Sequence, residues 1–201
     1  MASDNLHVNP TIGVLAAQGD FIEHIAVFRR LGVDTREIRL PHQMEGISGL
    51  VIPGGESTTI SKLMDIYDLR AAIVRRAKQG MGVWGTCAGM ILLAKRLTEN
   101  SVHPLGLMNI TVARNAFGRQ VDSFEADLQV KGLMGGPFTA VFIRAPVVHE
   151  VGEGVDVLAA LPDGRAVAVR QGKLLATAFH PELTPDTRIH RYFVDMVKGP
   201  D

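Results

Sequence analysis

Short apolar stretches alternate with stretches of helical periodicity through the first half of the chain. Strand patterns cover 11–17, 33–40, 49–55 and 81–85, and helical patterns cover 20–32, 57–80 (interrupted near Tyr67) and 88–97. Strands that return in the same direction after each helix form a parallel sheet with helices on both faces. The first half therefore predicts an α/β fold with a mainly parallel sheet.

The second half of the chain is rich in strand patterns and poor in helical ones. Strand patterns cover 105–115, 119–130, 138–146, 154–161, 165–170 and 173–180, and Gln171 with Gly172 suits a tight hairpin. A last helical pattern spans 184–199, with Thr184 as the expected N-cap and Pro185 in the first turn. We expect antiparallel strands to extend the sheet and both halves to share one domain.

The charge balance limits the classes of partner. The 201 residues hold 21 lysines and arginines against 21 aspartates and glutamates, so no net field attracts nucleic acid or an anionic membrane. A single cysteine excludes an internal disulfide, and no apolar run reaches the about 20 residues that span a bilayer. These observations predict a cytoplasmic protein with no nucleic-acid or membrane partner.

The single cysteine lies in "GTCAG", where a strand pattern changes into a helical one. Gly85 and Gly89 stand two residues before and after Cys87, as a sharp strand-to-helix turn that carries a nucleophile requires. The start of a helix favours the thiolate, and the backbone N–H of Ala88 is placed to stabilise an oxyanion. Glycines also occur at ordinary strand ends, so the spacing alone leaves a reactive and a buried structural cysteine open.

His180 is the best candidate for a base among the seven histidines. It ends an apolar strand pattern, Pro181 stops strand pairing, and Glu182 stands two residues away. Such a histidine opens toward the face where α/β sheets bind ligands, and a nearby carboxylate orients its ring. A simple turn at "HPE" is the alternative. The other six histidines, His24 and His190 in helical patterns among them, are expected on the surface or on a helix face.

Residues 53–58, "PGGEST", form a second glycine turn before a helical pattern that begins near Ser57. Such a turn presents N–H groups to an anion or a polarised carbonyl. Because it lacks the lysine of a phosphate-binding loop, nucleotide binding is the weaker interpretation. Its place at the same sheet edge as Cys87 suggests the second half of an oxyanion hole.

Six stretches carry a resemblance to a known family. They are "GVLAAQGDFIEH", "PGGESTT", "WGTCAGMILLA", "RNAFGRQVDSFE", "FIRAP" and "LATAFHPELT", in order from about residue 12 to residue 184. Together they resemble the glutaminase subunits of pyridoxal 5′-phosphate synthases, within the triad (class I) glutamine amidotransferases. The resemblance implies a three-layer α/β/α sandwich with a flavodoxin-like sheet. It also implies a single amidotransferase domain over 11–199. Residues 1–10, which we expect to be a flexible N-terminal extension, depart from the family.

The resemblance implies hydrolysis of L-glutamine to L-glutamate and ammonia through a cysteine thioester. Cys87 would attack the side-chain amide, His180 would move the proton and Glu182 would orient His180. The implied glutamine pocket consists of Gly55, Glu56, Ser57, Arg114, Ile143 and Arg144, and the implied oxyanion donors are the N–H groups of Gly55 and Ala88. By charge, either arginine suits the α-carboxylate of glutamine and Glu56 suits its α-ammonium group.

The resemblance also implies a partner, but no metal and no cofactor. The partner is a (β/α)-barrel synthase subunit, joined with the glutaminase in a large hetero-oligomer, which takes the ammonia to build pyridoxal phosphate from sugar phosphates. Docking is expected to organise the turn at 53–55, where Gly54 and Gly55 permit a peptide flip.

Two other function classes fit parts of the sequence. Another cysteine hydrolase of the same fold, acting on a different amide or ester, would share the turn around Cys87 without needing "PGGESTT" or two pocket arginines. A non-catalytic relative kept as a binding subunit would typically lack one of Cys87, His180 and Glu182, and all three are present.

Overall fold

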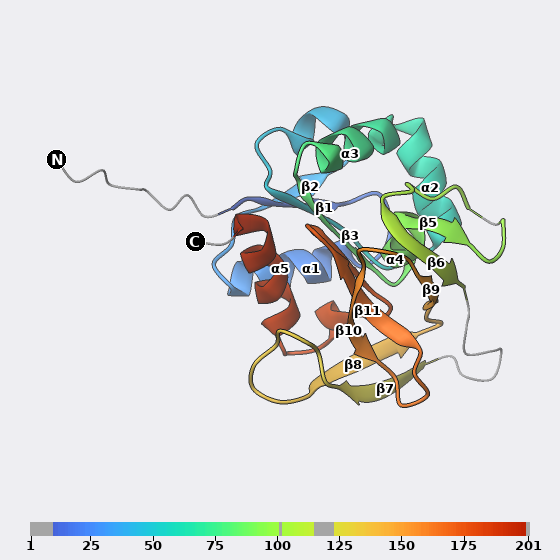
Figure 1. The fold of residues 1–201 in the computed structure, drawn as a ribbon. Helices are drawn as coiled ribbons and strands as arrows, with labels where there is room; N and C mark the ends of the chain where they lie inside the picture. The colour runs from blue at the N-terminus through green and yellow to red at the C-terminus, as the bar shows by residue number, and fades with distance from the viewer. Residues whose placement is uncertain (1–9, 101, 115–122, 200–201) are drawn as a thin grey trace.

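A computed structural model describes residues 10–100, 102–114 and 123–199 of the protein (Figure 1). Most of the expected N-terminal extension, 1–10, and the start of the strand pattern at 119–130 lie outside these residues. The extension and the single domain over 11–199 therefore stay predictions. None of the helices in the described part of the chain has both the length and the apolar composition needed to cross a membrane.

The described residues form a ten-stranded sheet in the order β2-β1-β3-β4-β12-β11-β9-β6-β5, with β10 paired to β11. The strands that build its first half are β2 (Thr35–Ile38), β1 (Ile12–Leu15), β3 (Gly49–Ile52), β4 (Gly82–Thr86) and β12 (Leu174–Thr177). These five pair in parallel. β1, β3 and β4 are buried along their whole length, whereas β2 at the edge is partly exposed, as expected for a parallel sheet covered on both faces.

Antiparallel strands extend the other side of the sheet, as predicted from the second half of the sequence. They are β11 (Ala166–Gln171), β10 (Asp156–Ala160), β9 (Val147–Val151) and β6 (Met108–Ala113), followed by β5 (Ala94–Leu97), which is parallel to β6. The predicted hairpin is confirmed: Gln171 pairs with Leu174, and Gly172 adopts φ +57° in the turn between them.

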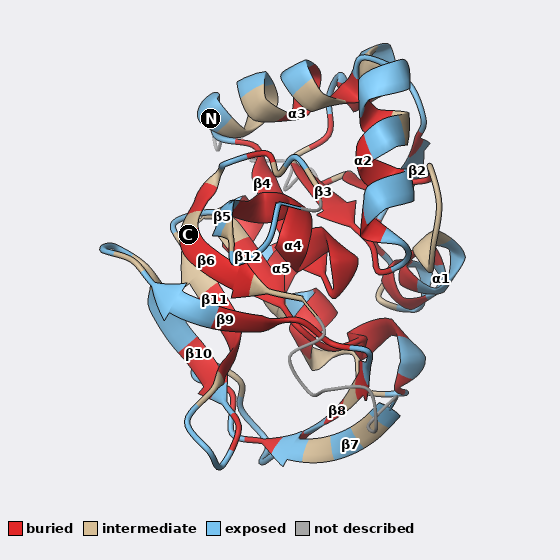
Figure 2. Ribbon diagram, turned by 90° about the vertical axis from the view of Figure 1, so that its right-hand side faces the viewer, coloured by how far each residue is buried: buried red, intermediate tan, exposed pale blue. Residues whose placement is uncertain are grey.

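Helices cover both faces of the sheet and make the predicted three layers (Figure 1). α1 (Phe21–Arg30) and α5 (Arg188–Lys198) lie on one face, where Trp84 of β4 packs against His24 and Phe193. α2 (Ser57–Ile66), α3 (Leu69–Lys78) and α4 (Ala88–Leu93) lie on the other. Buried residues concentrate in the central strands and in α4 (Figure 2), so the core lies between the layers.

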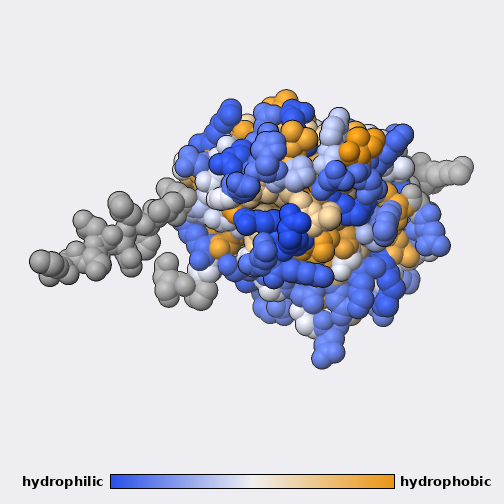
Figure 3. Space-filling model, turned by 90° about the horizontal axis from the view of Figure 1, so that it is seen from above, coloured by the Kyte–Doolittle hydropathy of each residue, from blue (hydrophilic) through white to orange (hydrophobic). Residues whose placement is uncertain are grey.

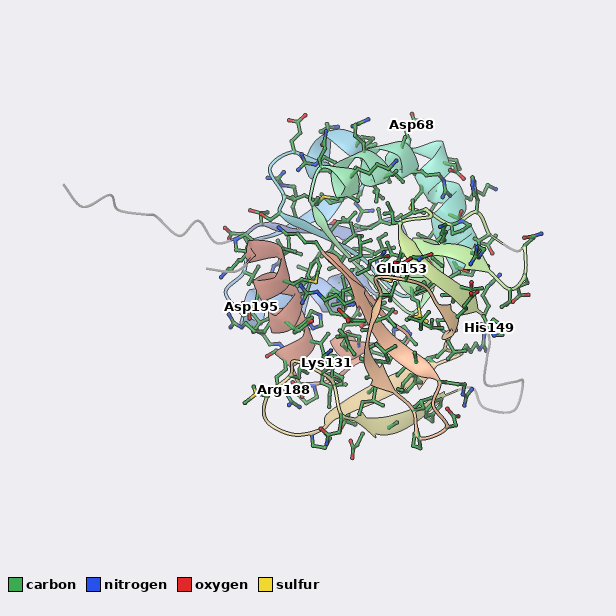
Figure 4. All side chains as sticks on the ribbon, viewed as in Figure 1. Asp68, Lys131, His149, Glu153, Arg188 and Asp195 are labelled. Carbon is green, nitrogen blue, oxygen red and sulfur yellow. The ribbon has the colours of Figure 1, made fainter. Side chains whose placement is uncertain are left out.

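A separate two-stranded sheet, β7 (Ser123–Leu128) with β8 (Phe138–Ile143), flanks the carboxyl end of β12. The N–H of His180 donates to the carbonyl of Val141 at 2.8 Å, which joins β8 to the segment after β12. Figure 4 shows Arg188, at the start of α5, near the β7–β8 connection, where it donates to the carbonyls of Met134, Gly136 and Pro137. These bonds hold the small sheet in place beside the main one.

The predicted helix over 88–97 is wrong in its second part. α4 ends at Leu93, and Ala94 turns to φ −57°, ψ 149°, from which β5 pairs with β6. All six residues of α4 are buried, so its apolar pattern has no exposed side that would mark its end. Pairing with a distant strand decided the conformation of 94–97.

The last helix begins later than predicted. α5 starts at Arg188 with Thr187 at the N-cap, whereas the Thr184 hydroxyl donates to the carbonyl of Pro181 and closes a 3₁₀ turn, η2 (Pro181–Leu183). Asp186 then accepts from the backbone N–H of Arg188 at 2.9 Å. Thr184, Pro185 and Asp186 thus belong to a separate turn, and α5 begins about one helical turn later than predicted.

Candidate active site

Cys87 sits on a strained turn between β4 and α4. Its backbone has φ 47°, ψ −105°, an uncommon conformation for a residue with a side chain. A Cβ added to Gly85 would lie 2.3 Å from the backbone of Gly89, and one added to Gly89 would lie 2.0 Å from the carbonyl oxygen of Ile52. Both glycines are therefore required for the turn, as the spacing predicted, and Cys87 is held at its tip.

The parallel pairing of β4 with β12 brings the cysteine and the histidine together. Thr86 lies opposite Thr177, and the N–H of Cys87 donates to the carbonyl of Thr177 at 2.8 Å. His180 follows three residues later, and the interaction of its ring with the cysteine side chain contributes to the raised pKa of His180. The thiol itself is 8% exposed and donates to the carbonyl of Ile143 at 3.8 Å.

His180 is paired with a buried carboxylate. Its Nδ1 lies 2.7 Å from Oε1 of Glu182, and Oδ2 of Asp20 lies 3.4 Å from the same nitrogen. Burial opposes the charged ring, but hydrogen bonds with Asp20, Cys87 and Glu182 outweigh it and raise the pKa of His180 above its ordinary value of 6.5. Nδ1 is thus committed to the carboxylate, which leaves Nε2 available to exchange a proton with a neighbouring group.

A cavity of ≈540 Å³ opens onto the thiol. Its lining residues are Gln18, Asp20, Gly55, Glu56, Ser57, Cys87, Ala88, Ile91, Arg114, Ile143, Arg144 and His180. All six residues named for the glutamine pocket line it, although they come from separate parts of the chain. Glu182 lies behind His180, with its side chain fully buried. The structure gathers the predicted site residues around one space, and their individual roles stay predictions.

A larger hollow of ≈680 Å³ lies over α2 and α3. Its walls include Asp65 and Arg70, which pair with each other. The face seen from above mixes hydrophilic with hydrophobic side chains (Figure 3). Its described lining residues include no cysteine or histidine, in contrast to the cavity beside Cys87.

The glycine turn at 53–55 packs against the segment before α1. The carbonyl of Gly54 accepts from the N–H of Asp20 at 3.2 Å, and Gly55 has φ +144°. A Cβ on Gly54 would lie 2.4 Å from Cε1 of His180, and one on Gly19 would lie 1.8 Å from the carbonyl oxygen of Gly54. Gly54 therefore lets the turn approach His180, and Gly19 lets the segment before α1 approach the turn.

Glu56 caps the N-terminus of α2. Its carboxylate accepts from the N–H groups of Thr58 at 3.0 Å and Thr59 at 2.6 Å, and from the Thr59 hydroxyl at 2.7 Å. The hydrogen bond from the Thr59 side chain, with the backbone bonds, lowers the pKa of Glu56 to about 2. An α-ammonium group at this position would have to share the carboxylate with the N-terminus of α2.

Removing this cap is expected to reduce stability in a pH-dependent way. Glu56→Ala should lower the free energy of unfolding by about 1 kcal/mol at pH 7. Because the folded-state pKa is depressed, the charged cap stabilises fully above pH 4.5 and is lost as the pH falls toward 2. The free energy of unfolding of Glu56→Ala, measured with urea, should therefore differ less from that of the wild type at pH 3 than at pH 7. Glu56→Gln, which keeps an acceptor but cannot titrate, should differ from Glu56→Ala by an amount independent of pH; a constant gap between wild type and Glu56→Ala would contradict the assignment.

Asp20, His180 and Glu182 also deserve comparison with a metal site, because their ligand atoms all lie within 4.8 Å of one another. The 2.7 Å separation of Nδ1 and Oε1 is that of a hydrogen bond, shorter than the spacing of two ligands on a tetrahedral metal ion. The arrangement therefore suits proton handling.

Two histidines outside the cavity lie close to the site. His24 and His190, predicted on the surface or on a helix face, lie on the buried faces of α1 and α5, and Nε2 of His24 lies 3.3 Å from Oε2 of Glu182. The sequence does indicate that His190 is buried, because it lies on the same face of the helix as the apolar residues Phe193, Val194 and Val197.

A cysteine on a strand-to-helix turn, with a histidine–glutamate pair at the end of the next parallel strand, is typical of cysteine-dependent hydrolases with an α/β/α fold. The model of the SNO glutamine amidotransferase family matches residues 14–199, and the chain belongs to that family.

Known proteins of this kind are similar over most of the chain. The pyridoxal 5′-phosphate synthase subunit PdxT of Herpetosiphon aurantiacus is 60% identical over 189 residues, which cover 92% of this chain and 100% of that protein. The PdxT subunit of Rhodococcus opacus is 52% identical over 198 residues, which cover 94% of this chain and 98% of that protein. A crystal structure of a glutamine amidotransferase superposes with a TM-score of 0.88 at 51% identity, covering 93% of this chain and 98% of the other.

Proposed function

We propose that this chain is the glutaminase subunit of a pyridoxal 5′-phosphate synthase, which hydrolyses L-glutamine and delivers ammonia to a synthase subunit. The observation that carries the proposal is that Cys87 and His180 line one cavity, with Nδ1 of His180 at 2.7 Å from Oε1 of Glu182. The PdxT relatives bear the name of the same synthase.

The chemistry follows from this geometry. The Cys87 thiolate attacks the side-chain amide carbon of glutamine, and the His180 imidazolium gives its proton to the leaving nitrogen, which departs as ammonia. The thioester that remains is hydrolysed by water, whose proton passes to His180, and glutamate leaves. The N–H groups of Ala88 and Gly55 are the donors proposed for the oxyanion in both steps. Glu182 orients His180 and stabilises its charge.

The cavity suits the two ends of glutamine. Arg114 and Arg144 line it and supply the positive charge that an α-carboxylate requires. Glu56 stands at the same wall, and Ile143 offers an apolar surface to the methylene groups. No metal and no cofactor takes part in this mechanism.

The partner we propose is a (β/α)-barrel synthase subunit in a large hetero-oligomer of the cytoplasm. Ammonia released without an acceptor is lost, so control of hydrolysis by docking is chemically reasonable. The turn at Gly54 and Gly55 is the element we assign to this control, because the Gly54 carbonyl accepts from Asp20 and a Cβ on Gly54 would lie 2.4 Å from the His180 ring.

Addition of the synthase subunit is therefore expected to raise glutamate release from glutamine by about tenfold or more. The measurement is the rate of glutamate formation by the full chain, alone and with the synthase subunit at saturating concentration. Equal rates would remove the control by docking and leave the triad chemistry intact. No release under either condition, with hydrolysis of another amide or ester, would favour a different cysteine hydrolase.

A further inference from the structure

A pair of buried histidines lies behind the glutamate of the proposed triad. His24 of α1 and His190 of α5 are 0% exposed, and their rings pack at 5.5 Å and 4.9 Å from the ring of Trp84. The two helices meet here on the face of the sheet opposite α4. Neither histidine lines the glutamine cavity, and the mechanism above uses neither of them.

A chain of polar contacts leads from the histidine pair to the reacting thiol. Nε2 of His190 lies 2.9 Å from Nδ1 of His24, and Nε2 of His24 lies 3.2 Å from the Thr86 hydroxyl and 3.3 Å from Oε2 of Glu182. The other oxygen of Glu182 holds His180, which meets Cys87. His24 thus faces the one carboxylate oxygen that His180 leaves unused.

The protons of the pair can be placed by elimination. Burial lowers the pKa of both His24 and His190, so each ring carries one N–H. In the described part of the chain, Nδ1 of His190 has no hydrogen-bond partner, and a buried bare acceptor is easier to tolerate than a buried orphan N–H. The proton of His190 therefore sits on Nε2 and points to Nδ1 of His24. The proton of His24 is then on Nε2, directed at Thr86 and Glu182.

Oε2 of the Glu182 carboxylate requires a hydrogen-bond donor, and the N–H of His24 is placed to be that donor. The side chain of Glu182 is fully buried, and Oε2 makes no hydrogen bond within the described residues, so the N–H of His24 is the polar group that faces it. At 3.3 Å this contact is longer than a good hydrogen bond, and contacts of this kind often shorten once substrate is bound. A buried carboxylate with one oxygen unsupported would otherwise be free to turn away from His180.

We propose that His24, held in one tautomer by His190, is a positioning residue that supports the second oxygen of Glu182 and so keeps the carboxylate aimed at His180. The proposal rests on the glutaminase function proposed above. It extends the triad by two residues that never touch glutamine.

The test compares two amides at position 24. His24→Gln places an amide N–H where Nε2 stands, toward Glu182, whereas His24→Asn places one where Nδ1 stands, toward His190. With the synthase subunit present, His24→Asn should lower kcat for glutamine about tenfold or more and leave KM nearly unchanged. His24→Gln should keep most of the wild-type kcat. Equal losses in the two variants, or a loss carried by KM, would overturn the proposal.

A double-mutant cycle separates positioning from a general structural role. In a Glu182→Gln background, His24→Asn should have little further effect, because its target is already gone. The full loss in that background would show that His24 does not act through Glu182. If thermal unfolding shows that His24→Asn does not fold, His190→Leu takes its place; it releases the tautomer of His24 and should lower kcat, and a wild-type kcat would contradict the inference. A wild-type complex that releases no glutamate would instead count against the proposed function itself.

Discussion

Replacement of Cys87 by alanine is expected to abolish glutamine hydrolysis, with kcat about 10⁴-fold or more below that of the wild-type complex. The thioester requires a sulfur nucleophile, and no other cysteine exists in the chain. Water attacking directly would keep only the help of the oxyanion donors and of substrate binding. The measurement is glutamate release with the synthase subunit present, over hours, so that a residual rate can be detected.

The fold should survive this substitution, since alanine keeps the Cβ and the strained backbone at φ 47° is the same for both residues. Urea unfolding of the two proteins checks that point. A glutamine-like diazoketone offers a matched experiment: it should add its mass to Cys87 in the wild type and to nothing in Cys87→Ala. Full hydrolysis by Cys87→Ala would falsify the mechanism.

The predictable parts of this molecule are those fixed by local chemistry. Gly85 and Gly89 flank the cysteine because any side chain there would strike backbone atoms, and a constraint of that kind is visible in five letters of sequence. The pairing of His180 with Glu182 is likewise local, since the two residues are separated by one proline. The class of fold followed from the alternation of strand and helix patterns.

The parts that were missed depend on contacts between distant segments. Residues 94–97 became a strand because β6 was available to pair with them. His24 and His190 are 166 positions apart and meet only after α1 and α5 pack on the same face of the sheet. The residue types alone do not predict that these two histidines are in contact. The apolar pattern of α5 does predict that His190 lies on the buried face of that helix.

The negative charge of Glu56 predicts a ligand for an ammonium group, but its position before a helix predicts an N-cap. A carboxylate beside a glycine turn suggested a ligand for an ammonium group, yet a helix that begins at Ser57 makes the preceding residue its N-cap. The structure gives the carboxylate three donors from Thr58 and Thr59. The sequence predicts the start of this helix near Ser57, and the residue before a helix start is its N-cap.

Replacement of Gly19 by alanine is the second change expected to have a large effect on activity. The added Cβ would lie 1.8 Å from the carbonyl oxygen of Gly54, and backbone atoms cannot rotate away as a flexible side chain would. The Gly54–Gly55 peptide must therefore shift, and the N–H of Gly55, the proposed oxyanion donor, shifts with it. Loss of one such donor lowers kcat by about 10²- to 10³-fold.

Gly80→Ala is the matched control for this experiment. Gly80 has φ +97°, close to the +98° of Gly19, so alanine there meets a similar backbone strain, but nothing lies within 4 Å of its added Cβ. Both variants should lose stability in urea unfolding, whereas only Gly19→Ala should lose kcat with the synthase subunit present. If both variants lost kcat alike, strain in the fold would account for the effect. If neither lost it, the peptide between Gly54 and Gly55 would have no part in stabilising the oxyanion, and the second donor would have to be sought elsewhere on the cavity wall.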